Sequence, residues 1–200
     1  MFKFNKVILL TVLLSMLLLS AGASLAAHFD IVVGEQSKII FKSKAPLEKF
    51  DGKTKKLSGF FEADLANLGG AVTLEVEIDL ASFDTGKKKR NKHMRENHLE
   101  TDKFPKAWFR AGSIKSASKI SLAGGESVTI VLSGKLDLHG VEKAHDVTLQ
   151  LTQASDGSVR IQGEFPVKLS EHDIKRPKFL VMKLADEQLV VIDLLARQKS

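Results

Sequence analysis

Regular alternation of apolar and polar residues is the feature that most constrains the fold of this 200-residue chain. Between positions 72 and 80 every second residue is Val, Leu or Ile, and the residues between them are Thr, Glu or Asp. This period of two is typical of a β-strand with one buried face. Similar patterns recur at 39–45, 57–65, 104–114, 128–138, 147–151, 159–169 and 189–196.

Turn signals separate these segments at hairpin spacing, namely Asp51-Gly52, Gly69-Gly70, Gly124-Gly125, Gly140 and Asp156-Gly157. The pattern therefore predicts about eight antiparallel strands in an all-β fold. Eight such strands close into a barrel or pack as a sandwich. The segment 128–138 would extend over roughly 30 Å, and strands of that length favour an extended barrel.

Three glycines, Gly59, Gly134 and Gly163, fall inside predicted strands. A glycine in a strand interior indicates a bend or a place where something approaches the backbone closely. We therefore expect a bend or a ligand contact at these positions.

Composition removes several classes of protein. An apolar share of 44% is enough for a core, which excludes a wholly disordered chain. The chain has no Cys, which excludes disulfides, a thiol nucleophile, Fe–S clusters and Cys-ligated zinc. The mean hydropathy of −0.02 excludes a polytopic membrane protein, although it leaves room for one hydrophobic segment.

One hydrophobic segment, residues 7–19, follows the basic residues Lys3 and Lys6 and precedes small residues at 20–27. This order is typical of a secretory signal. We expect residues 1–26 to be a signal peptide, cleaved after Ala26 or, alternatively, after Ala23, and residues 27–200 to form a single domain. An uncleaved anchor is less favoured because a spanning helix needs about 20 apolar residues.

Export has consequences for charge and location. Loss of Lys3 and Lys6 lowers the formal net charge from +6 to +4, which is mild, so nucleic acid is not an expected partner. An exported domain without disulfides fits a bacterial periplasm, where its core alone must hold it together.

Residues 87–99 break the alternation. They are polar, contain neither Gly nor Pro, and predict a short helix whose apolar contacts are Met94 and Leu99. Most basic runs such as 87–92 are solvated faces. The alternative is a patch at the rim of the barrel for an anionic head group or phosphate, because Lys and Arg pair with phosphate oxygens.

Catalytic motifs are weak. Asp84-Thr85-Gly86 matches the triplet of aspartic proteases, but that chemistry needs two carboxylates and the chain has one copy. A strand end capped by Asp84 and turned by Gly86 is the favoured interpretation. There is no G-x-S-x-G motif and no evident set of nucleophile and base, so we predict no catalytic residue.

The six histidines do not predict a metal site. His93 and His98 are five residues apart, which turns them about 140° from each other on a helix. No H-E-x-x-H motif is present. His139 and His145 flank Gly140 and could meet across the turn, but no third ligand is evident, and His28 and His172 stand alone.

The aromatic residues are twelve Phe, one Trp and no Tyr. Phe41, Phe61, Phe109 and Phe165 fall on the apolar faces of their strands. They either fill the core of a small barrel or line a cavity for a long apolar ligand, and the sequence leaves both open. Trp108, next to Phe109, is expected to point outward.

Six blocks occur in an order and spacing that resemble a known family. They are Ser37-x-Ile39-x-Phe41, Leu57–Phe61, Ile78–Gly86, Arg90–Phe109, Gly134–Lys143 and Ile192–Ala196. Together they are similar to the YceI-like, polyisoprenoid-binding proteins of bacterial periplasms. One departure lies at 169–177, where many members carry an Arg-x-Asp-Phe-Gly-like stretch.

The resemblance implies a lipocalin-like, extended eight-stranded antiparallel β-barrel with one short helix. It also implies a non-enzymatic carrier that holds a polyisoprenoid, such as a quinone tail, or a fatty-acid-type lipid, with no other cofactor. The helix at 87–99 is the candidate lid, with Arg90, His93 and Arg95 as candidate rim residues for the head group. The candidate cavity-lining residues, taken from the alternation, are Ile39, Phe41, Phe61, Leu74, Val76, Ile78, Met94, Phe109, Ile130, Leu132, Leu149, Phe165, Val167 and Ile192.

Two other functions stay open. One is an interaction module with a filled barrel that recognises another envelope protein. The other is an enzyme on a lipid-like substrate that uses His93 or His98 as a base. Transient contact with a membrane surface and a homodimer are both compatible with a carrier.

Overall fold

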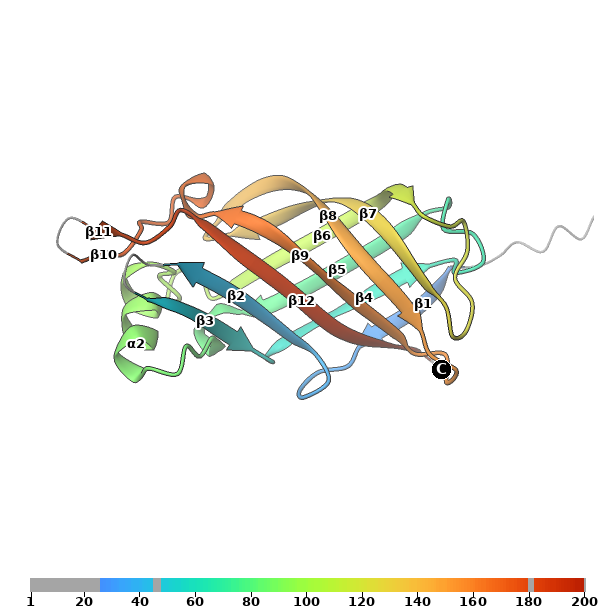
Figure 1. Cartoon of the computed structure of the whole chain (residues 1–200), viewed down its shortest axis with the longest axis horizontal. Helices are drawn as coiled ribbons and strands as arrows, with labels where there is room; N and C mark the ends of the chain where they lie inside the picture. Colours follow the sequence, from blue (N-terminus) through green and yellow to red (C-terminus); the bar gives the residue numbers. More distant parts are fainter. Residues whose placement is uncertain (1–25, 45–47, 180–181, 200) are drawn as a thin grey trace, which may run out of the picture.

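The computed structural model describes residues 26–44, 48–179 and 182–199 (Figure 1). The predicted signal peptide therefore lies outside the described residues, apart from Ala26. None of the helices in the described ranges is both long enough and apolar enough to cross a membrane.

The described part of the chain is built mainly of strands. The strands are β1 (Ala27–Ile31), β2 (Lys38–Lys44), β3 (Lys49–Thr54), β4 (Leu57–Ala63), β5 (Val72–Asp79), β6 (Lys106–Ala117), β7 (Ser127–Leu138), β8 (Val141–Gln153), β9 (Val159–Lys168), β10 (Lys178–Phe179), β11 (Met182–Lys183) and β12 (Glu187–Gln198). The helical elements are the 3-10 turns η1 (Leu80–Ser82) and η2 (Leu169–His172) and the α-helix α2 (Lys88–Asn97).

Eight strands form a closed antiparallel barrel. Their order is β1-β4-β5-β6-β7-β8-β9-β12, and β12 pairs with β1 to complete the ring. Long hairpins carry most of the wall, since β6, β7, β8 and β12 each have twelve or thirteen residues. The predicted fold class, an extended eight-stranded antiparallel barrel with one short helix, is confirmed for the described residues.

β12 has different neighbours in its two halves. Residues 189–193 pair with β2, whereas residues 196–198 pair with β1. β3 continues the sheet beyond β2, and a bridge of two 2.9 Å hydrogen bonds joins Lys53 to Asp84, just after η1. The barrel diameter grows with the number of strands. The end that carries the β2–β3 hairpin is therefore the wider one.

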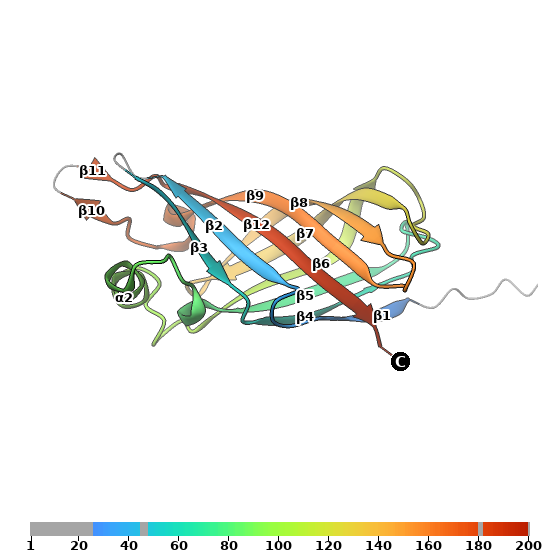
Figure 2. The same ribbon diagram turned by 60° about the horizontal axis from the view of Figure 1, so that its bottom comes forward.

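The two ends of the barrel differ in what covers them. α2 and the short hairpin β10–β11 lie at the wide end, while the C-terminus lies at the opposite end (Figures 1 and 2). α2 connects the end of β5 to the start of β6 by way of η1. We call the end with α2 the mouth and the opposite end the closed end.

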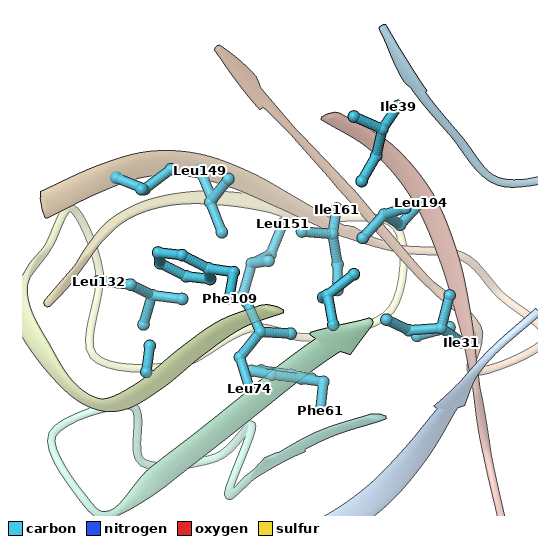
Figure 3. Packing of buried hydrophobic residues seen from close by; sticks show 14 of the residues in the cluster. Ile31, Ile39, Phe61, Leu74, Phe109, Leu132, Leu149, Leu151, Ile161 and Leu194 are labelled. Carbon is cyan, nitrogen blue, oxygen red and sulfur yellow. The ribbon is translucent and has the colours of Figure 1, made fainter. Parts of the chain in front are cut away.

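Apolar side chains fill the closed end. Figure 3 shows Phe61, Leu132 and Leu151 within the packed interior, and each is no more than 1% exposed. Phe29 packs on Phe61 with ring centroids 5.9 Å apart. Packing of this kind supplies the main favourable free energy of a domain without disulfides.

The sequence pattern missed four strands. β1 and β3 are short, and β10 and β11 have two residues each. β3 contains the Asp51-Gly52 pair that was predicted as a turn. The Phe41 ring of β2 packs directly on Gly52, since a Cβ there would lie 2.2 Å from it.

The strand glycines let neighbouring strands pack closely. A Cβ on Gly59 would lie 2.0 Å from the Glu75 carbonyl oxygen of β5, and the φ of Gly59 is +152°. A Cβ on Gly163 would lie 2.5 Å from the Thr148 carbonyl oxygen of β8. Both positions let adjacent backbones pack closely, which is one of the roles of glycine in strands.

We predict that Gly59→Ala destabilises the barrel by about 2 kcal/mol, because the new methyl group collides with β5 and the backbone angle is unfavourable for alanine. Urea unfolding followed by circular dichroism would measure the change. Gly112→Ala is the matched control, since a Cβ at that strand position has no atom within 4 Å. Equal stability of the two variants would contradict the prediction.

Candidate functional site

A pocket of about 640 Å³ lies inside the barrel and extends inward from the mouth. Its volume falls in the range of small-molecule sites, about 300–1,000 Å³. Apolar side chains from most of the barrel strands form its wall, while α2, η2 and the segment after η2 cover it. The exposed residues Lys89 and His93 of α2, and Lys87 just before the helix, belong to the lining, so the pocket reaches the surface beside the helix.

Most of the candidate cavity residues line this pocket. They are Ile39, Phe41, Leu74, Val76, Ile78, Met94, Phe109, Leu149, Phe165, Val167 and Ile192. Of the candidate rim residues, Arg90 and His93 line the pocket. Contact of any of these side chains with a ligand stays a prediction.

Four candidate residues lie elsewhere. Phe61, Ile130 and Leu132 face the interior but belong to the filled closed end, with exposures of 1%, 0% and 0%. Alternation identified their inward direction correctly but not their depth along the barrel. Arg95 lies on α2 outside the lining of the pocket.

Sequence reasoning missed several lining residues. Leu136 and Leu138 of β7 line the pocket because the β7–β8 turn lies at the mouth. Ile161, Leu169 and Leu194 were also missed, although they lie in alternating segments. Phe83, Ile174 and Leu184 come from segments without clear alternation. Gln188 is a polar lining residue, and it is 6% exposed and donates to the Ala185 carbonyl oxygen at 2.7 Å.

α2 forms where the sequence predicted a helix and covers the mouth (Figure 2). Met94 and Leu99 pack against the hydrophobic core, as expected, and both line the pocket. At the C-terminal end of the helix, His98 Nδ1 lies 2.8 Å from the Lys175 carbonyl oxygen. The helix is therefore tied to the segment after η2.

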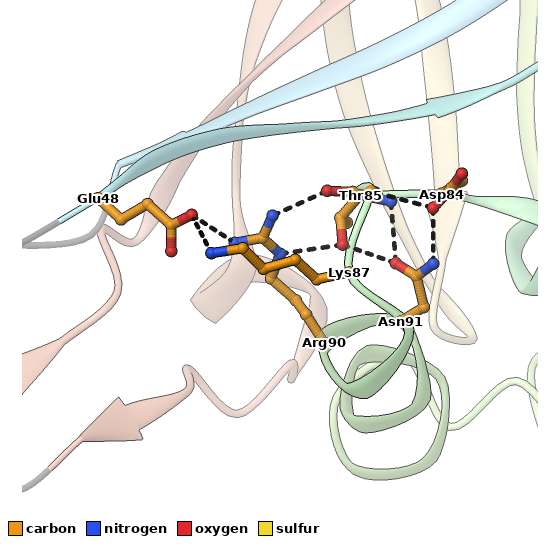
Figure 4. A network of polar contacts seen from close by, with 7 residues as sticks. Glu48, Asp84, Thr85, Lys87, Arg90 and Asn91 are labelled. Carbon is orange, nitrogen blue, oxygen red and sulfur yellow. Dashed lines mark hydrogen bonds and ion pairs between the residues drawn. The ribbon is translucent and has the colours of Figure 1, made fainter.

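A polar network fixes the other end of α2 (Figure 4). Arg90 donates from Nε to Thr85 Oγ1 at 2.9 Å and from Nη2 to the Thr85 carbonyl oxygen at 2.8 Å. Asn91 accepts from the Thr85 backbone at 2.9 Å and donates to Asp84 Oδ1 at 2.7 Å. These bonds set the start of the helix against the end of the η1 segment.

The same arginine joins α2 to β3. The Glu48 carboxylate lies 2.8 Å from Lys87 Nζ and 3.1 Å from Arg90 Nη1. The Arg90 guanidinium also lies 3.9 Å from the centre of the Phe50 ring. The hydrogen bond from Lys87 and, to a smaller extent, the one from Arg90 hold the pKa of Glu48 below its usual value. Arg90 is therefore engaged in positioning the lid, which leaves Lys89 as a cationic side chain at the pocket opening, with the His93 imidazole beside it in the lining.

Three histidines lie in or beside η2 near the mouth. His172 of η2 is fully buried, and its Nδ1 donates to the Val141 carbonyl oxygen at 2.9 Å. His145 lies 6.2 Å from His172 between ring centres, with nearly parallel planes, and packs on Phe165. His139 contacts the His172 carbonyl oxygen and Glu100 at 3.1 Å each.

This cluster corrects two expectations. His172 is not isolated, because it packs on His145. His139 does not meet His145 across the turn; the strand register places His145 opposite Gly134. Burial has the larger effect in lowering the pKa of His145, and the nearby His172 lowers it further. The Nε2 atoms of His145 and His172 have no hydrogen-bond partner among the described residues.

The remaining motifs have structural roles. Asp84 accepts from the Gly86 backbone at 2.8 Å, and Gly86 has a φ of +78°, so the Asp-Thr-Gly triplet is a capped turn as expected. The hydrogen bond from Asn91 and, to a smaller extent, the one from the Gly86 backbone hold the pKa of Asp84 below its usual value.

Trp108 is half-buried on the outer face of β6. The Arg110 guanidinium lies 4.4 Å from the centre of its ring. The described residues contain no group of three or more metal-ligating side chains.

A closed antiparallel barrel that is packed at one end and hollow at the other, with a helix over the opening, defines a class of single-barrel protein with an internal apolar pocket. The model of the YceI-like domain family matches residues 31–196 of this chain. The chain belongs to this family, which confirms the resemblance found in the sequence.

Relatives and solved structures agree with the family. Protein YceI of Shigella flexneri is 30% identical over 167 residues, covering 80% of this chain and 82% of the relative. A UPF0312 protein of Photorhabdus laumondii is 32% identical over 130 residues, covering 64% of this chain and 62% of the relative, so the chain spans less than two thirds of that protein.

Two solved structures share the fold. A polyisoprenoid-binding domain from Saccharophagus degradans has a TM-score of 0.67 at 20% identity, covering 87% of this chain and 99% of that domain. BcnA of Burkholderia cenocepacia has a TM-score of 0.66 at 24% identity, covering 80% of this chain and 95% of that one.

We predict that Arg90→Ala loosens the lid. The variant loses the bonds to Thr85 and Glu48 and the contact with Phe50, a loss of about 1.5 kcal/mol. Hydrogen exchange of the α2 amides should become about tenfold faster. Arg95→Ala, on the same helix but outside this network, is the control. Equal exchange in both variants would show that the network does not hold α2.

We also predict that His145 makes the barrel less stable in acid. Its pKa in the unfolded chain is near 6.5 and is lower in the folded protein, so stability falls as the pH drops through 6.5 towards the folded pKa. His145→Leu should therefore gain stability relative to the natural protein between pH 8 and pH 5, measured by urea unfolding.

His28 provides a control of opposite sign. Hydrogen bonds to Glu62 and then Asp30 raise its pKa, so its protonation stabilises the fold in acid. His28→Gln should lose stability relative to the natural protein at pH 5 more than at pH 8. If both variants follow the natural pH profile in parallel, neither histidine contributes as stated.

Proposed function

We propose that this protein is a non-enzymatic carrier of the bacterial periplasm that holds a long-chain amphiphile in its pocket. The ligand is a polyisoprenoid, such as a quinone tail, or a fatty-acid-type lipid. The observation that carries the proposal is the pocket of about 640 Å³ with an almost wholly apolar wall at one end of a closed barrel.

The chemistry of the pocket suits a hydrocarbon chain. Burial of apolar surface contributes about 0.8 kcal/mol per CH₂, so a long tail could bind tightly without hydrogen bonds. The charged lining residues are all found at the mouth, on α2 and at Glu48. A tail would therefore extend towards the closed end, with its polar head beside Lys89 and His93.

The binding partner of a structural neighbour supports the choice of ligand. The Saccharophagus degradans domain with the same fold is a polyisoprenoid-binding domain. The residues 1–26, with their secretory pattern, support export to the periplasm. The pocket also weighs against the alternative of an interaction module, because that function was expected to go with a filled barrel.

The carrier proposal is tested by lipid analysis and probe uptake. The exported protein, purified without detergent and extracted with organic solvent, should yield a prenyl or long-chain acyl lipid by mass spectrometry. It should also take up a fluorescent long-chain acyl or prenyl probe. A protein that is always lipid-free and takes up neither probe would overturn the proposal.

We predict that Ala107→Phe lowers the affinity for either probe by at least about tenfold. Ala107 lines the pocket and is 2% exposed, so a phenyl ring would occupy space that the tail needs. Ala144→Phe, on the outer face of β8, is the matched control and should bind normally. Fluorescence titration measures both, and unchanged affinity of Ala107→Phe would place the ligand elsewhere.

A further inference from the structure

The positive charge of the molecule is concentrated on the helix that covers the mouth. Residues 87–98 contain six Lys or Arg and one Glu, a formal charge of +5. The loops at the closed end, 64–71, 118–126 and 154–158, contain one Lys and three Asp or Glu, a formal charge of −2. The helix at the mouth is therefore a concentrated patch of positive charge, and the closed-end loops counted here carry none of that sign in excess.

The exposed side of α2 carries these charges outward. Met94 faces the pocket, whereas Lys88 and Lys92 are exposed and lie outside the pocket lining. Lys89 is exposed at the pocket opening. Lys88 and Lys89 form no ion pair with any described residue, and Lys92 is 4.0 Å from Glu96. Most of this charge is thus not neutralised within the described part of the chain.

We infer that this face of α2 docks on a bilayer surface that contains anionic phospholipid, placing the mouth against the membrane. The inference rests on the proposed carrier function, because a long-chain amphiphile partitions into bilayers and must leave or enter one. Each Lys or Arg near such a surface contributes attraction that falls off within a Debye length, about 8 Å at physiological salt. The positive charge of residues 87–98 also orients the approaching barrel.

The surface chemistry favours a membrane over an acidic protein. Protein interfaces usually have an apolar or aromatic centre that carries the binding energy. The strongly exposed large apolar residues among the described ones are Val33 and Ile120, on the β1–β2 and β6–β7 loops, and neither lies on α2. A lysine-rich face without an apolar anchor suits reversible, salt-sensitive contact with lipid head groups.

The test uses the exported protein and two kinds of vesicle, one of phosphatidylcholine alone and one with about a third phosphatidylglycerol. The protein should co-sediment with the anionic vesicles at 50 mM NaCl, bind them at least tenfold more weakly at 300 mM NaCl, and ignore the neutral vesicles. Lys88 and Lys92 lie outside the pocket lining, so K88E/K92E should reduce vesicle binding at least about tenfold while probe uptake from solution stays normal.

The matched control is K115E/K119E, which changes the net charge equally near the closed end, where these lysines face Asp146 and Glu126. It should keep vesicle binding. The inference is overturned by equal binding to both kinds of vesicle, by equal losses in the two variants, or by binding to polyglutamate but not to anionic vesicles, which would indicate an acidic protein. Failure of probe uptake with intact vesicle binding would instead overturn the carrier proposal.

Discussion

The forked pairing of β12 is the constraint on which the rest of the structure depends. Near the closed end β12 bonds to β1 and completes the ring, while nearer the mouth it bonds to β2 and leads the wall outward through β3. One end is therefore narrow enough for side chains such as Phe61 to fill, and the other is too wide to be filled from the wall alone. The pocket, the covering helix and the network that holds that helix all belong to this wider end.

Much of the fold follows from local sequence. Alternation in 72–80 and 128–138 identified strands and their buried faces, because a one-residue change of register would expose the whole apolar set. A helix was predicted at 87–99 because that stretch lacks both alternation and breakers, and α2 occupies 88–97. β3 was missed because its Asp51-Gly52 pair matches a turn signal, and its pairing depends on contacts with Phe41 and Asp84 that are distant in the sequence. Strand pairing of that kind is non-local and leaves little trace in a short window.

The sequence predicted which side chains face the barrel interior but not how far along the barrel axis each of them lies. Ile130 and Leu136 share the inner face of β7, yet only Leu136 lines the pocket. Counting hairpins from the predicted helix would have placed the β7–β8 turn at the mouth and so separated these two positions. No comparable signal marks the Arg90 network or the packing of His172 on His145, because both join segments that come together only in the folded barrel.

The β2–β3 hairpin also allows the internal width of one end of the barrel to change through changes in its own sequence. It is attached along one edge of β12 and by the bridge between Lys53 and Asp84, while the eight-stranded ring closes independently of it. Insertions, deletions or changes of residue size in this hairpin can therefore alter the calibre of one end without shifting the register of the ring. A single peripheral hairpin thus offers a means of changing the internal width of one end of the barrel while the ring of strands stays the same.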